Sequence, residues 1–167
     1  MASQWYSLVS QKVYLARLLL AQLEQTDELA QSSDQPPAAL KEALTQGVTE
    51  LLLRSRSSLL TMIARSHQQK HAAPQSLDEL KALIPYEVQE VENLELLAGD
   101  RSSWWNHLAQ LEKAISQPPA PKKTVSADNI IAVSAEEGPD RSAKRIQESL
   151  TALAEFARAL EERHSEW

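Results

Sequence analysis

The stretch that decides the fold runs from Ser3 to Glu28 and reads SQWYSLVSQKVYLARLLLAQLEQTDE. At the 3.6-residue period of an α-helix, its main apolar stripe contains Trp5, Leu8, Val9, Ala16, Leu19, Leu20 and Leu23. Tyr14 and Leu18 add apolar surface on the opposite side. Because a helix that is apolar on both sides needs neighbours on both, we expect a helical bundle wrapped around this N-terminal helix.

The composition favours the same fold class along the whole chain. The 167 residues are 43% hydrophobic but only 5% aromatic, and leucine and alanine, which are strong helix formers, dominate the apolar set. This length suits one domain with a proper core. We therefore predict an all-α, single-domain bundle of about five helices: residues 1–117 form the bundle, 118–139 an extended linker and strap, and 140–167 a C-terminal helix that packs on the bundle.

The charge balance and the lack of cysteine limit the partners and the cellular compartment expected for the chain. Seventeen Lys and Arg against 23 Asp and Glu give a net charge of −6, which opposes binding to a phosphate backbone. Without cysteine the chain has no disulfide, thiolate zinc site or cysteine nucleophile, which fits a reducing compartment. The N-terminus shows neither a signal peptide nor a run long enough to span a membrane. We expect a cytoplasmic protein that binds neither nucleic acid nor membrane.

Several residues mark helix ends. Ser3 is expected to cap the first helix, and Pro36 and Pro37 to open the second. Ser76 and Glu79 have the spacing of a capping box, in which each side chain accepts a hydrogen bond from the other residue's backbone N–H. Gly99 is expected to end an acidic helix in the left-handed conformation. The last helix should bury a seam made of Ala143, Ile146, Leu150, Leu153, Ala157 and Leu160.

A polar stretch before the last helix carries one apolar cluster. Gln117 to Asn129 is rich in proline, lysine, serine and alanine, which predicts an extended connection. Ile130 to Val133 is the only β-like cluster in the chain. We expect it to dock on the bundle as a strap, with pairing to the same strap of a second chain as the alternative.

Short motifs spread over the chain resemble those of a family of small bacterial proteins, mostly from proteobacteria, that is known only as a domain of unknown function. The motifs are Gln11, Lys12, Val13, Tyr14 and Ala16 in the first helix, Trp104 followed by Gln117, Pro118 and Pro119, then Ile131, Ala132, Val133 and Ser134, and the closing Glu166 and Trp167. The resemblance implies an all-helical fold and carries over no activity.

Known catalytic patterns are missing. Three glycines cannot form a Walker A loop or a dinucleotide-binding fingerprint, and no Gly-x-Ser-x-Gly elbow occurs. The four histidines lie in or beside polar stretches and are expected to be exposed. A di-metal carboxylate bundle needs Glu-x-x-His on two helices, but only Glu161 and His164 have that spacing, so we interpret the pair as a solvated helix end. We expect no cofactor.

Three residues are candidate site residues. Lys12 falls near the centre of the apolar stripe, where it either reaches water, pairs with a carboxylate, or lines a pocket as an anion ligand or base. Arg65 and His71 have a spacing seen in helical ribonucleases, but Arg101 to His107 and Arg158 to His164 repeat it.

The leading functional hypothesis is a non-enzymatic protein that acts through protein–protein interaction, with a separate partner or as a homo-oligomer. The alternative is a ribonuclease-like or anion-binding enzyme that uses Arg65 and His71, or Lys12. Enzymatic activity is the less favoured class because no catalytic constellation stands out.

Overall fold

A computed structural model describes residues 3–31, 37–118 and 138–165, and within these ranges the chain forms six helices and no strand. The helices are α1 (Gln4–Leu29), α2 (Ala38–Ser66), α3 (Leu77–Leu83), α4 (Gln89–Gly99), α5 (Trp104–Ser116) and α6 (Ala143–Ser165). The prediction of an all-α single domain is therefore confirmed. The predicted strap at Ile130–Val133, and most of the linker before it, lie outside the described residues.

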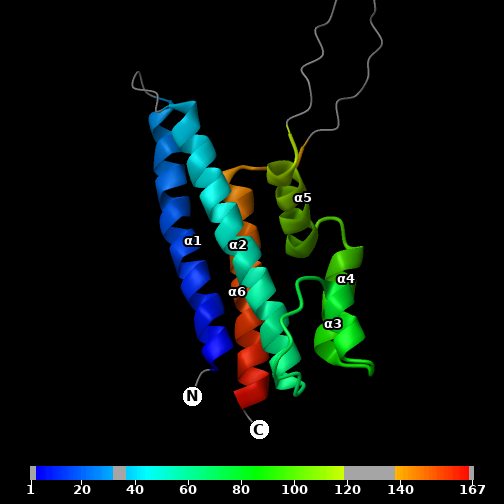
Figure 1. Ribbon diagram of the computed structural model, residues 1–167. Helices are drawn as coiled ribbons and strands as arrows, with labels where there is room; N and C mark the ends of the chain where they lie inside the picture. The colour runs from blue at the N-terminus through cyan, green and yellow to red at the C-terminus, as the bar shows by residue number, and fades with distance from the viewer. Residues whose placement is uncertain (1–2, 32–36, 119–137, 166–167) are drawn as a thin grey trace, which may run out of the picture.

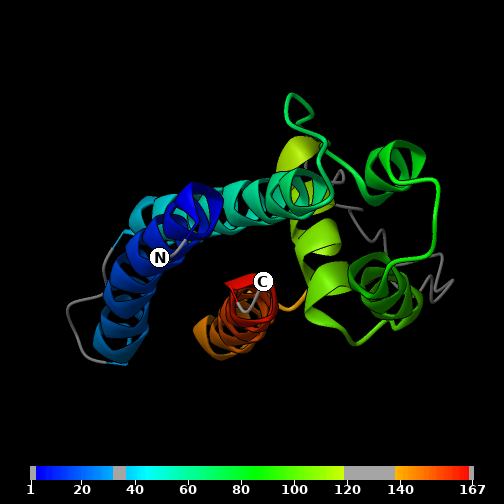
Figure 2. The same cartoon turned by 90° about the horizontal axis from the view of Figure 1, so that it is seen from below.

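The first two helices form a long antiparallel hairpin; α3, α5 and α6 pack on α2, and α4 packs on α3 and α5 (Figure 1). Helix α6 lies behind α2 in this view and also contacts α1. Helix α5 packs on α2 and α6, and the short helices α3 and α4 extend the core away from α1 (Figure 2). Within the described residues, no helix has the length and apolar content that a membrane crossing requires.

Helix α2, not α1, occupies the centre of the bundle. Its buried residues surround much of its circumference: Thr45, Val48, Thr49, Leu52, Leu53, Ser55, Arg56 and all residues from Leu59 to Ala64. Helix α1 buries one side only, since Tyr14 is 59% exposed and Leu18 is 49% exposed. The expectation that neighbours cover both sides of the first helix was therefore wrong, because α2 and α6 both pack on the same side of α1.

Apart from the exposed side of α1, packing between the helices follows the apolar patterns of the sequence. Every member of the predicted seam of α6 is buried. Ser55 donates a hydrogen bond from Oγ to the carbonyl of Leu51 (2.9 Å), so its polar group is satisfied within α2. A Cβ atom added to Gly47 would lie 3.0 Å from Cδ1 of Leu19, so α1 and α2 approach closely at this glycine.

The serine caps at Ser3 and Ser76 agree with the sequence, whereas Pro37 is the residue before α2 rather than part of its first turn, and one C-terminal cap also differs. Ser3 accepts from the N–H of Tyr6, and Ser76 accepts from the N–H of Glu79. The Glu79 carboxylate accepts from the N–H of Gln75 rather than from that of Ser76. The left-handed cap at Gly99 was a wrong prediction: Gly99 is the last residue of α4, and no glycine in the described ranges has positive φ.

Replacing Ser76 with alanine is expected to lower the free energy of unfolding by about 1 kcal/mol, because the N–H of Glu79 loses its acceptor. Urea unfolding measures this loss. The matched control is Ser10→Ala in the exposed middle of α1, where alanine is the better helix former and stability should be unchanged or slightly higher. Equal losses in both variants would contradict the capping role.

Candidate functional site

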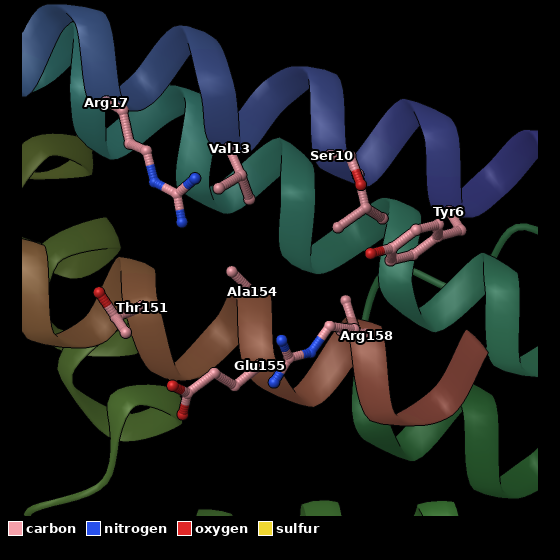
Figure 3. A pocket seen from close by; sticks show the side chains of 10 residues that line it. Tyr6, Ser10, Val13, Arg17, Thr151, Ala154, Glu155 and Arg158 are labelled. Atoms are coloured by element: carbon pink, nitrogen blue, oxygen red, sulfur yellow. The ribbon is translucent and has the colours of Figure 1, made fainter. Parts of the chain in front are cut away.

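A groove of about 310 Å³ runs between α1 and α6. Its lining comes from both helices: Tyr6, Val9, Ser10, Val13 and Arg17 from α1, and Thr151, Ala154, Glu155, Ala157 and Arg158 from α6. Figure 3 shows Val13 and Ala154 facing each other across the groove, with Tyr6 and Arg17 reaching from α1 toward α6. Because small side chains stand on the α6 wall, the groove has a narrow apolar floor and a polar rim.

The rim of this groove carries two arginines, one from each wall. Arg158 lies within 3.7 Å of the carboxylate of Glu162, one turn further along α6. No residue in the described part of the chain forms an ion pair with Arg17, although its guanidinium extends over the groove (Figure 3). The groove therefore combines an apolar floor with two arginines and the carboxylate of Glu155, and Arg17 has no ion-pair partner among the described residues.

A second cluster joins the ends of three helices. His67 is the residue that caps α2, Glu90 lies in the first turn of α4, and His164 lies in the last turn of α6. The Nε2 atom of His67 lies 3.5 Å from Oε2 of Glu90, and Nε2 of His164 lies 3.3 Å from Oε1. One donor atom from each of the three residues falls within 4.8 Å of the others. This His67–Glu90–His164 cluster is the set of described residues able to hold a metal ion.

Local structure fixes the position of His67 in the cluster. Gln68 has a φ of 65°, and the N–H of Gln69 donates to the carbonyl of Ala64, so a left-handed turn stops α2 directly after His67. The His67 ring packs edge-on to the rings of Tyr86 and His164, with centroids 6.0 and 6.1 Å away. Holding a non-glycine residue in the left-handed region costs free energy, and such strained residues cluster at functional sites.

The electrostatics of the cluster keep Glu90 ionised. Only 5% of Glu90 is exposed, and this burial raises the pKa of its carboxyl. Its own backbone N–H and the neighbouring His164, His67 and Arg163 outweigh the burial and leave the pKa of Glu90 below its usual value. Arg163 supplies one charged hydrogen bond, from Nη1 to Oε1 (3.3 Å).

His107 is buried elsewhere in the bundle and is fully hydrogen-bonded. Its Nε2 lies 2.7 Å from the carbonyl oxygen of Asp140, and its Nδ1 lies 2.7 Å from Oγ of Ser149. A carbonyl only accepts, so Nε2 carries the proton and Nδ1 accepts from the Ser149 hydroxyl. The expectation that all four histidines are exposed was wrong: His107 is 4% exposed, and His67 and His164 are half-buried, because each packs between helices.

The candidate residues from the sequence do not form one site. Lys12 is half-buried on α1 and is not among the residues that line the α1–α6 groove. Arg65 stacks over the ring of Trp5, with its Cζ 5.5 Å from the ring centroid. His71 is exposed in the segment after α2.

The Glu161 and His164 pair separates in the fold. The carboxylate of Glu161 accepts two hydrogen bonds from Ser3, one from its backbone N–H (2.6 Å) and one from its hydroxyl (3.0 Å). His164 instead faces Glu90. The histidine that the sequence assigned to a solvated helix end is therefore part of the three-residue cluster, and no local spacing in the sequence signals this.

A sequence model for DUF6586, described as a family of unknown function, matches residues 1–167. The match confirms the resemblance to a family known only as a domain of unknown function. No curated protein and no solved structure matches the chain.

Proposed function

Because the chain belongs to the DUF6586 family, whose function is unknown, we propose a function from its own residues: it is a non-enzymatic protein that binds the helix of a partner protein in the α1–α6 groove. The partner helix is amphipathic and carries carboxylates on one side of its apolar face. The single observation that carries this proposal is Arg17, which extends over an apolar groove without an ion-pair partner among the described residues. We further propose that the protein acts in the bacterial cytoplasm.

The shape of the groove suits a helix. Val13 and Ala154 face each other across it, and the small side chain of the half-buried Ala154 lets a docking backbone approach α6 closely. Helix-in-groove recognition uses apolar anchors at helical spacing on the partner, which such a floor can receive. The site lies between two helices that themselves pack on α2.

The charges around the groove select for an acidic partner. Arg17 has no ion-pair partner among the described residues, and the only ion pair of Arg158 there is an exposed one with Glu162. Exposed pairs of this kind contribute only about 0–1 kcal/mol, so Arg158 is readily available to a partner. Arginine binds carboxylates with two parallel hydrogen bonds and is enriched among residues that dominate interface energies.

Apolar side chains extend the surface beyond the groove. Tyr14 and Leu18 are exposed, and the four-residue spacing from Ser10 to Tyr14 to Leu18 sets them side by side on α1. Tyrosine is enriched in protein interfaces because it offers a large apolar ring with a polar tip. A helix seated in the groove can therefore also cover part of the side of α1 that the bundle leaves exposed.

The enzyme alternative finds less support in the contacts. A helical ribonuclease would need Arg65 and His71 to face one substrate, but Arg65 packs on Trp5 while His71 is exposed. Lys12 is half-buried away from the groove lining. These contacts therefore favour the interaction proposal over the enzyme alternative.

The test places a photo-crosslinking amino acid at Ser10, inside the groove, in cells of the native host. We expect one main crosslinked protein whose contact peptide is an amphipathic helix with Asp or Glu. Titrating a synthetic peptide of that sequence onto purified protein should show at least tenfold weaker binding to Arg17→Glu, because a charge-assisted bond becomes a repulsion. The control Arg101→Glu, an exposed arginine far along the chain, should bind within twofold of the wild type.

Three results would overturn the proposal. One is a crosslink that persists unchanged in the Arg17→Glu variant, and another is the absence of any crosslink from Ser10. The third is a crosslinked peptide from α1 of a second copy, which would show that this surface serves self-association instead.

A further inference from the structure

We infer that the His67–Glu90–His164 cluster binds a divalent transition-metal ion of the zinc type. This inference is independent of the groove, since no residue of the cluster lines it. The cluster has the side-chain types of a metal site, donor atoms that lie close together, and two buried nitrogen atoms that have no hydrogen-bond partner among the described residues.

The donor set selects the class of ion. Two imidazole nitrogens and one carboxylate suit zinc and its first-row neighbours, whereas magnesium and calcium prefer oxygen ligands alone. The carboxylate belongs to Glu90, which is only 5% exposed, so an oxygen ligand is held inside the protein beside the two imidazoles. With no cysteine in the chain, a thiolate site is excluded, and a mixed histidine and carboxylate site is the form open to this protein.

The distances between the donor atoms are compatible with three ligands around one ion. Nε2 of His67 lies 3.5 Å from Oε2 of Glu90, and Nε2 of His164 lies 3.3 Å from Oε1. Zinc bonds of about 2.0–2.1 Å in a tetrahedral arrangement separate neighbouring ligand atoms by about 3.3 Å. Each histidine nitrogen therefore stands near that separation from one oxygen of Glu90, and one donor atom from each of the three residues lies within 4.8 Å of the others.

Hydrogen bonding leaves the same atoms without partners. Nε2 of His67 and Nε2 of His164 are both buried and make no hydrogen bond with any described residue. A buried nitrogen without a partner costs free energy, and a metal ion removes that cost by accepting its lone pair. Both atoms face the same carboxylate, so one ion between them would satisfy all three groups.

The number of protein ligands and the contact with Arg163 define the expected coordination of the ion. Three protein ligands leave a fourth tetrahedral position for water, as in zinc sites that are not purely structural. Arg163 donates to Oε1 of Glu90, and a hydrogen bond of this kind commonly orients a metal-ligating carboxylate. Since the donor atoms lie within 4.8 Å of one another, binding needs only small rotations of the two imidazole side chains.

Isothermal titration of the EDTA-treated, dialysed full-length protein with zinc chloride tests the inference. We expect one ion per chain with micromolar or tighter affinity, and a rise in the unfolding midpoint of about 5–10 °C at a hundredfold excess over Kd. His164→Ala should weaken binding at least a hundredfold. This variant carries the test because His164 lies in the last turn of α6, where its removal opens no cavity in the core.

Glu90→Gln and the exposed histidine His71 complete the set. Glu90→Gln keeps the size of the side chain but removes the ligand charge, so it should also weaken zinc binding at least tenfold. His71→Ala is the matched control and should bind within twofold of the wild type. Cobalt should give visible absorption bands of a four-coordinate site in the wild type and in His71→Ala, and these bands should disappear in His164→Ala.

Equal zinc affinity in the wild type and His164→Ala would overturn the inference, as would an equal loss in His71→Ala, which indicates binding to surface histidines in general. Binding weaker than millimolar in the wild type would also overturn it. The three side chains would then form only an ion-paired cluster between histidines and Glu90.

Discussion

Replacing Leu20 with alanine is expected to lower the free energy of unfolding by about 2–5 kcal/mol. Leu20 lies in the middle of α1 and is 1% exposed, so it belongs to the core that α1 shares with the rest of the bundle. The substitution removes buried methyl groups and leaves a cavity that neighbouring helices close only in part. The measurement is the urea midpoint at an unchanged m-value.

The same helix supplies the control. Leu18→Ala makes the same chemical change two residues away, but Leu18 is exposed and should lose less than about 0.5 kcal/mol. Leu160 on α6 is buried as well, so Leu160→Ala should cost about as much as Leu20→Ala. A small loss at Leu20 together with a large loss at Leu18 would show that α1 packs by its other side.

Replacing His107 with alanine is expected to cost about 2–4 kcal/mol at pH 8. The imidazole joins α5 to the start of α6, because it donates to the carbonyl of Asp140 and accepts from the hydroxyl of Ser149. Removing it leaves both groups without their partner inside the bundle and opens a cavity. Urea unfolding compares this variant with Asn106→Ala, whose side chain bonds the exposed end of α4 and whose loss should be smaller.

The same residue links stability to pH. Burial lowers the pKa of His107, and the positive charge of Arg145 lowers it further, while the hydrogen bond to Asp140 and the charges of Asp140 and Glu148 act in the opposite direction. Below about pH 6.5 the imidazole of His107 binds a proton in the unfolded chain, whereas in the folded chain it stays neutral until the pH reaches its lowered pKa. His107 therefore destabilises the fold progressively as the pH falls from about 6.5 to the lowered pKa, and has no such effect above that window.

Measuring urea midpoints from pH 8 to pH 5 separates this contribution from that of other groups. The loss of stability on acidification should be smaller in His107→Ala than in the wild type, because the variant has no imidazole to protonate at this position. Parallel pH profiles for the two proteins would show that folding leaves the pKa of His107 unchanged, contrary to this expectation.

The sequence predicted the parts of the fold that depend on local pattern. Ser3 and Ser76 cap helices as hydroxyl residues do before apolar runs, and the regular spacing along α6 identified its buried side. Such features need only neighbours in sequence. The position of α1 in the bundle could not be derived in this way, since Tyr14 and Leu18 are apolar whether or not another helix covers them.

The candidate sites depend on which helix ends meet. His67, Glu90 and His164 come from the ends of three helices, and the two histidines are flanked by polar residues that indicated solvated helix ends. Only the packing of α4 and α6 near the end of α2 brings them together. Arg17 poses the same difficulty: its sequence context marks a charged residue on a helix, but the groove that it overhangs exists only once α6 lies beside α1.

The two hydrogen bonds between Ser3 and Glu161 hold the first turn of α1 beside the last turns of α6 (Figure 1). The two ends of the described chain therefore lie at the same end of the bundle, and a short peptide could join them into a closed backbone ring. Cyclisation would restrict the unfolded ensemble while leaving the native helices where they are, and the entropy removed grows with the logarithm of the ring length. In this fold the first and last helices already stand in the arrangement that a circular chain would impose.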